Sequence, residues 1–123
     1  MPKKSDQFNY PGGVIGFPRQ VLRSVAYKDL STNARALMFE LQDIWAPFKL
    51  DLHYSVRRAA QSLGVANGTA GNAFKELIDH GFIRCVDESD WFNGKARVWR
   101  LNWLISRGKE PTNEWMEWEK NKS

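Results

Sequence analysis

The sequence predicts a single α+β domain whose elements follow in the order helix, strand, helix, helix, strand, strand. Apolar residues recur at three- and four-residue spacings in three segments, which is the pattern of helices with one buried face. Two later segments, 82–86 and 96–103, are rich in residues typical of strands. A chain of 123 residues can close one hydrophobic core but hardly two. We therefore expect one domain at 17–108, an N-terminal arm at 1–16 and a tail at 109–123.

The first helix is predicted at 32–45 and is followed by a short strand. Ser31 is a suitable N-cap residue, and Pro47 ends the helical pattern. From 48 to 54, apolar and polar residues alternate with the period of two that a half-buried strand requires. The core-facing positions of the helix are Ala34, Leu37, Met38, Leu41, Ile44 and Trp45. The polar side of the strand carries Lys49, Asp51 and His53.

Two further helices are predicted at 56–63 and 67–80. Ser55 can cap the first of them, and Gly64 provides the left-handed residue that commonly ends a helix. Gly81 ends the second helix in the same way. The buried face of this second helix consists of Ala70, Ala73, Phe74, Leu77 and Ile78. Its opposite face presents Gly68, Gly71, Asn72, Lys75, Glu76 and Asp79.

The strands at 82–86 and 96–103 are expected to form a hairpin, because their connection contains Asn93-Gly94, a pair that favours tight turns. Together with the strand at 48–54 they would make a small three-stranded antiparallel sheet. The segment after Pro111 predicts a short helical appendage.

The composition favours a cytoplasmic protein with a basic body. The single cysteine, Cys85, cannot form an internal disulfide, and no apolar stretch is long enough for a signal core or a membrane span. The net charge of +4 is unevenly distributed. Residues 1–109 carry 16 Lys and Arg against 10 Asp and Glu, or +6, whereas residues 110–123 carry 2 against 4, or −2. A basic body is compatible with nucleic acid, anionic lipid or an acidic partner.

The glycines near the start of the third helix do not form a phosphate-binding loop. Such a loop requires GxxxxGK[ST], in which the lysine reaches phosphate and the hydroxyl reaches magnesium. Only three residues separate Gly64 from Gly68, and no Lys-Ser or Lys-Thr pair follows. The preceding residues also predict a helix, whereas a dinucleotide site requires a buried strand there.

The sequence contains no catalytic or metal-binding pattern. His53, His80 and Cys85 lack the spacing and the number of ligands of a zinc site. A polar loop between strands accounts for the acidic residues Asp87, Glu88 and Asp90. We therefore expect no enzymatic activity, no cofactor and no metal.

Residues 60–83 read Ala-x-x-Leu-Gly-Val-x-x-x-Thr-Ala-x-x-Ala-Phe-x-x-Leu-x-x-x-Gly-Phe-Ile. This pattern resembles the core of winged helix-turn-helix proteins, which bind DNA. The resemblance extends over residues 17–103, since FPRQVLRSVAYKDLSTNARALMFEL is similar to the opening of winged-helix proteins from phages, plasmids and other mobile elements. These proteins include transcription regulators and replication initiators. The resemblance implies a three-helix core with the small sheet as its wing.

The resemblance further implies that helix 67–80 enters the major groove of double-stranded DNA while flanking basic groups contact phosphates. By position, the candidate contacts on this helix are Asn67, Gly68, Thr69, Asn72 and Lys75. An amide such as that of Asn72 can pair with adenine, Lys75 can reach guanine or phosphate, and Thr69 can reach phosphate or a thymine methyl. Arg57 and Arg58 are expected to hold the DNA backbone.

The start of this helix departs from the family pattern. Ala66 stands where family members usually place Ser or Thr, and the loss of such a cap costs about 0.5–2 kcal/mol. Gly68 and Gly71 each cost roughly 1 kcal/mol relative to alanine inside a helix. We therefore expect a frayed start that orders on DNA, with Asn67 as a substitute cap. Glycine also permits close approach of the backbone to a phosphate.

The sequence leaves the role of two surfaces open between alternatives. Lys95 and Arg97 in the hairpin suit a phosphate or minor-groove contact, but the acidic residues across the hairpin oppose it. In the tail, Trp115, Met116 and Trp118 indicate a protein contact, because such residues are enriched in interfaces. That contact is with a second copy of the chain, with the body of the same chain, or, if the chain serves replication or recombination, with a separate protein partner that the tail recruits.

The function expected from these observations is sequence-specific binding of double-stranded DNA, without catalysis, in the control of transcription within a mobile element. A homodimer would place two recognition helices about one DNA turn apart. One alternative is an accessory protein of replication initiation or recombination. Another is a winged-helix interaction module without DNA binding, which a weakened helix start would suit.

Overall fold

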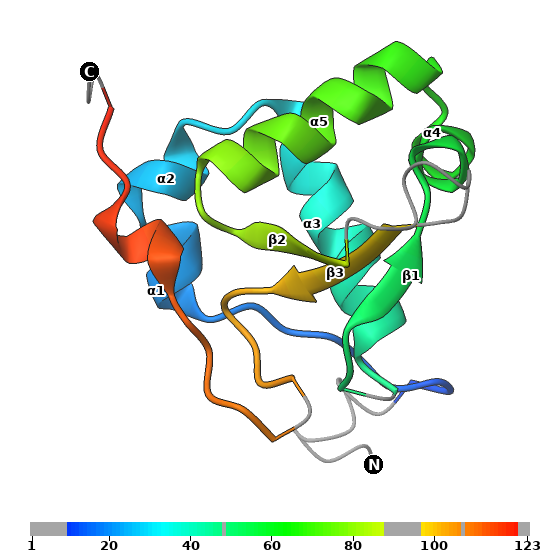
Figure 1. Ribbon diagram of the computed structural model, residues 1–123. Helices are drawn as coiled ribbons and strands as arrows, with labels where there is room; N and C mark the ends of the chain where they lie inside the picture. The colour runs from blue at the N-terminus through cyan, green and yellow to red at the C-terminus, as the bar shows by residue number, and fades with distance from the viewer. Residues whose placement is uncertain (1–9, 48, 88–96, 107, 121–123) are drawn as a thin grey trace, which may run out of the picture.

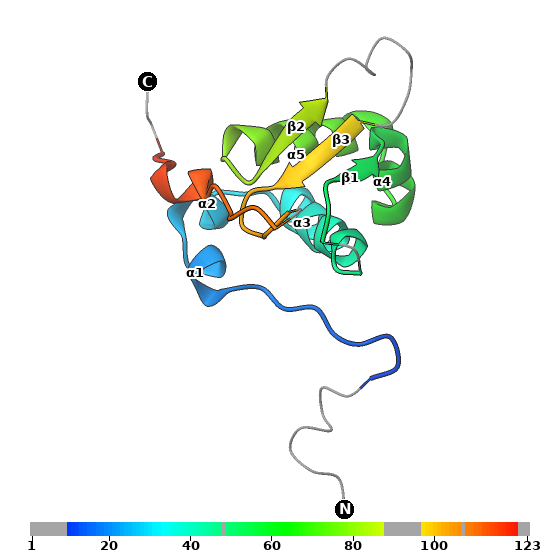
Figure 2. The same ribbon diagram turned by 60° about the horizontal axis from the view of Figure 1, so that its bottom comes forward.

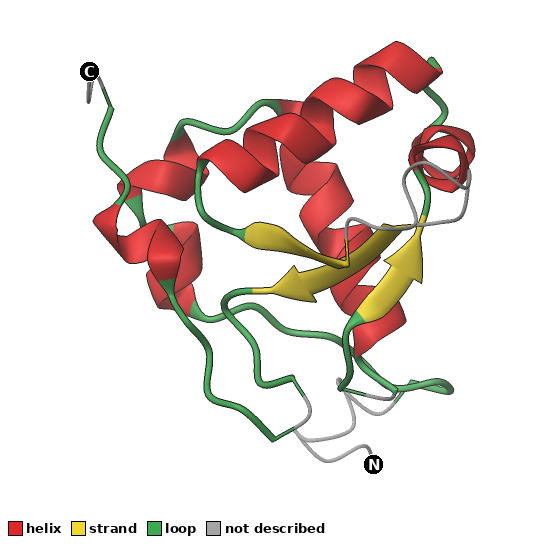
Figure 3. Cartoon of the chain, viewed as in Figure 1, coloured by secondary structure: helices red, strands yellow, loops and turns green. Residues whose placement is uncertain are grey.

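A computed structural model describes residues 10–47, 49–87, 97–106 and 108–120. They form an α+β structure in which helices pack against one face of a small antiparallel sheet (Figure 1, Figure 3). The elements in chain order are α1 (Arg19–Leu22), α2 (Val25–Lys28), α3 (Thr32–Trp45), β1 (Leu52–Tyr54), α4 (Val56–Leu63), α5 (Asn67–Asp79), β2 (Ile83–Asp87), β3 (Arg97–Leu101) and the 3₁₀ turn η3 (Glu114–Glu117). The predicted α+β class and the three-stranded antiparallel sheet are confirmed.

The three predicted helices are confirmed as α3, α4 and α5, and their ends are set by local caps. Ser31 Oγ accepts a hydrogen bond from the Ala34 N–H at 3.2 Å, and Ser55 Oγ accepts one from the Arg58 N–H at 3.1 Å. Gly64 ends α4 with a positive φ of 69°. Such caps depend on residues close in sequence, which is why the sequence locates these helices well.

The sheet has the strand order β1-β3-β2, with antiparallel neighbours. Trp99 in the central strand lies opposite Leu52 on one side and Cys85 on the other. Its side chain is fully buried and stacks on Phe74 of α5, with ring centroids 4.9 Å apart. This contact joins the sheet to α5, while α3 lies on the same side of the sheet (Figure 2).

The first strand is shorter than the predicted 48–54. Lys49 has a positive φ of 53°, and its N–H donates to the Trp45 carbonyl at 2.8 Å. The chain therefore continues to turn after α3 before it becomes extended. Asp51 also leaves the predicted alternation, because its side chain turns inward to Arg100 of β3.

An ion pair between the buried Asp51 carboxylate and the half-buried Arg100 guanidinium connects the start of β1 to β3. Arg100 donates from Nε and Nη2 to the two carboxylate oxygens, at 3.0 and 2.8 Å. The hydroxyl of Ser106 donates to the same carboxylate. The Asp51 side chain is only 1% exposed. The hydrogen bonds with the Asp51 carboxylate raise the pKa of Arg100 above its usual value, so the guanidinium stays charged.

Helices α1 and α2 are absent from the prediction. Each is a single turn of four residues, too short for an apolar repeat to be recognised. Val21 and Ala26 nevertheless enter the core. Before α1, Phe17 packs against Phe39 of α3 at 4.3 Å between centroids, and the Gly16 carbonyl accepts a hydrogen bond from the Gln42 amide of α3. The preceding residues 10–15 run away from the domain (Figure 2).

The C-terminal segment packs onto the domain, and the short helical appendage expected there is the single 3₁₀ turn η3. The Asn113 N–H donates to the Asn102 carbonyl at 2.9 Å and guides the chain back towards α5. Trp115 is 3% exposed and stacks on Phe82 at 5.8 Å. The segment after residue 108 therefore belongs to the same hydrophobic core. In the part of the chain that the structure describes, no helix has the length and apolarity needed to cross a membrane.

Candidate nucleic-acid interface

Helices α4 and α5 are packed closely through small side chains. Ala59 and Ala60 of α4 and Ala70 and Ala73 of α5 are all buried. The tight turn after Gly64 is closed by a hydrogen bond from the Val65 N–H to the Ala60 carbonyl at 3.0 Å. Such a short turn between helices brings the start of α4 beside the second turn of α5.

The start of α4 approaches α5 at Gly71. A Cβ atom added at Gly71 would lie 3.9 Å from Cγ1 of Val56, the first residue of α4. Arg57 and Arg58 follow Val56 directly, and both are exposed. The two arginines therefore follow directly on the residue of α4 that approaches the second turn of α5.

The exposed face of α5 is a stripe of polar residues, Gly68, Asn72 and Lys75, at spacings of four and three. All three are exposed, whereas Ala70, Ala73, Phe74 and Leu77 on the other side are buried. Asn67 is exposed at the start of the same helix and Thr69 is half-buried. The sequence-predicted contact residues of α5 are thus brought to its outer side, with Thr69 at the edge.

Glu76 does not contribute to this stripe, although it was predicted there. Its carboxylate accepts hydrogen bonds from the Ser31 N–H at 2.6 Å and from the Ser31 hydroxyl at 2.7 Å. A carboxylate at the N-terminus of α3 is favoured by the partial positive charge of that end. The first nine residues of α5 contain no acidic residue. The outer side of α5 is therefore basic up to Lys75.

Arg58 is held in place by the sheet. Its guanidinium lies 4.9 Å from the ring centroid of Tyr54, the last residue of β1. Burial raises the pKa of the Tyr54 phenol, so the ring remains neutral and suits a cation–π contact. Arg97 is paired with Tyr54 in the β1–β3 register, which places this half-buried residue at the same end of the sheet.

The start of α5 has no side-chain cap. Ala66 occupies the N-cap position, and Asn67 is the first residue of the helix, so the prediction that Asn67 acts as the cap is wrong. A cap residue needs an extended backbone before the helix, and Ala66 has it, with a ψ of 155°. The first N–H groups of α5 are accordingly open to an external acceptor such as phosphate. The predicted fraying of residues 66–71 remains a prediction.

Several predicted residues of the hairpin lie outside the described residues. These are Lys95, Glu88 and Asp90, and only the backbone of Asp87 is described.

The chain matches no protein-family model, no curated protein and no solved structure. The geometry of α4, α5 and β1 is therefore the basis for assigning a function. Among the described residues, no three His, Cys, Asp or Glu side chains are grouped so that they could hold a metal ion.

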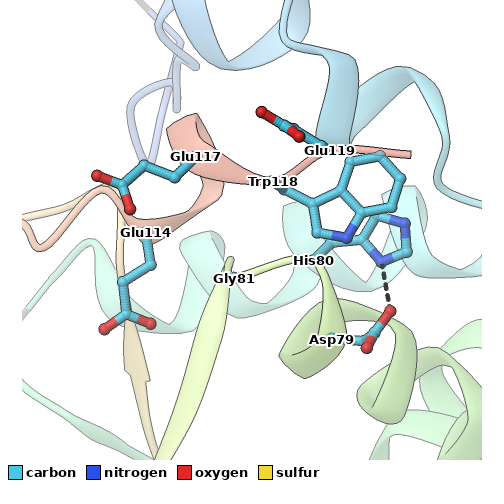
Figure 4. Close-up of a pocket in the computed structure, with 7 residues that line it drawn as sticks. All are labelled: Asp79, His80, Gly81, Glu114, Glu117, Trp118 and Glu119. Atoms are coloured by element: carbon cyan, nitrogen blue, oxygen red, sulfur yellow. Dashed lines mark ion pairs between the residues drawn. The ribbon is translucent and has the colours of Figure 1, made fainter. Parts of the chain in front are cut away.

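A second cluster lies at the other end of α5, where the tail packs. His80, at the C-cap of α5, lies within 2.8 Å of Asp29 Oδ2 through Nε2 and within 2.7 Å of the Glu76 carbonyl through Nδ1. Trp118 stacks on the His80 ring at 4.2 Å between centroids (Figure 4). The sequence predicts His80 at the end of a helix but does not predict its partners Asp29, which follows α2, and Trp118 of the tail.

The tail residues predicted to bind a partner thus separate into two groups. Trp115 is in the core and Trp118 is half-buried on His80, so both make contacts within the domain. Met116 remains 46% exposed. Of the alternatives for the tail, packing on its own domain accounts for the two tryptophans, and Met116 is left on the surface.

We expect the Asp29–His80 contact to make stability depend on pH in the acid range. The hydrogen bond with His80 lowers the pKa of Asp29 below its ordinary value of 3.8, against a smaller opposing effect of burial. A carboxyl group with a lowered folded-state pKa stabilises the fold above its unfolded pKa, and this contribution is lost as the pH falls through the folded-state pKa.

Urea unfolding of the wild type and of Asp29→Asn should therefore differ at neutral pH and converge well below pH 3.8. Asp43→Asn, which removes an exposed carboxylate from α3, is the matched control. A difference between the wild type and Asp29→Asn that stays unchanged down to the lowest pH would contradict this prediction.

Proposed function

We propose that the chain binds double-stranded DNA sequence-specifically as a winged helix-turn-helix protein, with α5 in the major groove and β2 and β3 as the wing. The observation that carries this proposal is the approach of Val56 to Gly71, because Arg57 and Arg58 follow Val56 in the chain and Asn72 follows Gly71. Phosphate-binding arginines next to an exposed amide are what direct readout in a major groove requires. The withdrawal of Glu76 supports it, because this carboxylate is engaged by Ser31 at the N-terminus of α3.

The roles of the residues follow from their chemistry. Asn72 would read a base edge, and Lys75 would contact a guanine or a phosphate. Arg57 and Arg58 would contact phosphates of the DNA backbone, and the open N–H groups at Gly68 would approach another phosphate. Following the resemblance to proteins of mobile elements, we propose that the bound site controls transcription.

Selection from a pool of randomised duplexes at two salt concentrations tests this proposal directly. We expect the wild type to enrich one motif, and Asn72→Ala to relax the preference at one position at a cost of about 1–3 kcal/mol. Arg57→Ala should weaken binding to all sequences alike and reduce the salt dependence by about one phosphate contact. The matched control is Lys109→Ala, which removes the same charge from an exposed loop residue remote in sequence from α4 and α5.

If no motif is enriched and binding does not weaken with salt, the chain does not read DNA. If binding weakens with salt but no motif appears, DNA binding is non-specific and the assigned role of Asn72 is wrong. An unchanged motif with Asn72→Ala would likewise remove that residue from base recognition.

The helix glycines provide a further prediction, in which stability and binding change in opposite directions. A Cβ added at Gly68 meets nothing within 4 Å, and one at Gly71 meets only Val56 Cγ1. Gly68→Ala and Gly71→Ala should therefore each stabilise the fold by up to about 1 kcal/mol. Gly68→Ala should also weaken DNA binding, because its methyl group would lie between the exposed start of α5 and a phosphate. The methyl group of Gly71→Ala instead meets α4, so this variant is the matched control and should leave DNA binding unchanged. Thermal unfolding and a duplex titration on the same samples measure the two effects, and tighter binding by Gly68→Ala would contradict the proposed close approach.

A further inference from the structure

A groove of about 480 Å³ lies between α1, α2 and the C-terminal segment. Its walls carry Val25 at the start of α2, which is 60% exposed, and Met116 of η3, which is 46% exposed. Trp115 lines the groove from the core, and Trp118 lines it from the tail. Single exposed apolar residues are ordinary, but apolar residues that face each other across a groove over buried tryptophan are typical of an interaction surface.

The walls of this groove are fixed by contacts inside the domain. The tail is anchored by Trp115 on Phe82 and by Trp118 on His80. The opposite wall is fixed by α2, whose N-cap Ser24 accepts a hydrogen bond from the Tyr27 N–H at 3.1 Å. The groove is therefore formed before any ligand arrives, which lowers the entropic cost of binding.

The surface next to the groove is acidic. On the other side of Trp118 lies an open cleft of about 520 Å³, lined by the carboxylates Asp79, Glu114, Glu117 and Glu119 (Figure 4). The basic group that lines this cleft is His80, and its ring already contacts Asp29. A ligand that occupies the groove passes Arg23 in its wall and, beyond Trp118, meets four carboxylates. The nearby Lys120 is paired with Asp29 at 3.5 Å, so the lining of the cleft stays predominantly acidic.

This charge selects among the possible occupants. DNA is repelled by the carboxylates. A second copy that used the same face would bring like charges together, because a two-fold interface pairs each surface patch with itself. An apolar side chain followed by cationic residues is complementary to both the groove and the cleft.

We propose that this surface binds a segment of another protein, with one apolar side chain between Val25 and Met116 and neighbouring Lys or Arg residues in the acidic cleft. The inference does not rest on DNA binding. The cleft begins at Asp79, about 18 Å along α5 from Asn67 at a rise of 1.5 Å per residue. The segment and the DNA therefore bind at opposite ends of α5, and the chain connects the two.

The proposal can be tested by selecting from a displayed library of random peptides, about twelve residues long, on the full chain. We expect the selected peptides to share an apolar residue flanked by Lys or Arg, and a synthetic consensus peptide to bind with an affinity that falls as salt rises. Met116→Lys, and separately Glu117→Lys with Glu119→Lys, should each weaken this binding about tenfold or more. All three residues are exposed, so the variants should fold normally, which near-ultraviolet circular dichroism checks.

The matched controls place the same changes elsewhere on the surface. Leu50→Lys alters an apolar residue that is 45% exposed, and Asp43→Lys reverses a charge on α3. Both should leave peptide affinity within about twofold of the wild type. Duplex binding, measured on the same samples, should survive Met116→Lys, so that a failure of this proposal is distinguished from a failure of DNA recognition.

Three outcomes overturn the proposal. One is that no peptide is enriched above the level recovered on a surface without the protein. Another is that the enriched peptides are acidic, or that Met116→Lys does not change their binding affinity. The third is self-association of the wild type in sedimentation that Met116→Lys abolishes, because the groove would then be an interface between two copies of the chain.

Discussion

Gly81→Ala is expected to destabilise the protein far more than Gly64→Ala, although both glycines have a positive φ. The values are 81° at Gly81 and 69° at Gly64, so the added methyl group costs about 1–2 kcal/mol through the backbone at either position. At Gly64 a Cβ meets nothing within 4 Å. At Gly81 it would lie 2.9 Å from the backbone nitrogen of Trp115 and 3.1 Å from its Cα. Only displacement of the tail can relieve this clash.

The extra cost at Gly81 is set by what the tail contributes when it is packed. Displacement exposes Trp115, and loss of a buried tryptophan costs about 3–5 kcal/mol. Since the tail can shift partly without leaving, we expect Gly81→Ala to lose roughly 2–4 kcal/mol more than Gly64→Ala in urea unfolding. Proteolysis should also release the C-terminal segment from Gly81→Ala under conditions in which Gly64→Ala is intact. Equal losses in the two variants would show that the contact with the tail is unimportant.

Arg100→Met should be the second severe substitution, because it removes the cation that compensates the buried Asp51 carboxylate and leaves the negative charge in place. The Asp51 side chain is 1% exposed and accepts both hydrogen bonds of the guanidinium. Removal of one member of a buried ion pair typically costs about 3–5 kcal/mol. Urea unfolding of the single variant measures this loss. A loss below about 1 kcal/mol, the value of an exposed pair, would contradict it.

The double variant Asp51→Leu with Arg100→Met is the control for this prediction. It removes both charges and replaces them with apolar groups of similar size, so no buried carboxylate remains without a partner. Such replacements are often neutral or stabilising. We therefore expect the double variant to recover most of the stability that Arg100→Met loses. If it is as unstable as the single variant, the loss comes from packing of the Arg100 side chain and not from the charge on Asp51.

Both predictions concern how the candidate interface is supported. The Asp51–Arg100 pair holds the start of β1 against β3, and β1 ends at Tyr54, which carries Arg58. Gly81 lets the tail close over the C-terminal end of α5. Loss of either contact should therefore weaken the arrangement of α4, α5 and β1 without altering a residue that is proposed to touch DNA.

The helices that carry the candidate site could be predicted from the sequence because local residues determine them. Ser31, Ser55 and Gly64 act on the backbone within four positions of themselves, and the apolar periodicity of α3, α4 and α5 is complete within each segment. The outward position of Asn72 and Lys75 follows from the same periodicity. The short helices α1 and α2 were not predicted, because a single helical turn contains no repeat of apolar residues.

The partners of the charged residues could not be predicted, because they depend on segments far apart in the chain. Glu76 and Asp51 look alike in the sequence, as acidic residues on polar faces. Glu76 caps α3 through Ser31, 45 positions away, and Asp51 pairs with Arg100, 49 positions away. Spacing reports which face of an element a residue occupies, but not which other element that face meets.

The sequence by itself thus determined the α+β class, the three longer helices and the residues on the outer side of α5. The tertiary structure alone decided that Glu76 leaves this surface, that Val56 meets Gly71 beside the two arginines, and that the tail closes over Gly81. The physical reason is the range of the interactions. Caps and apolar periodicity act within a few residues, whereas burial and ion pairing act between whichever segments the complete fold brings together.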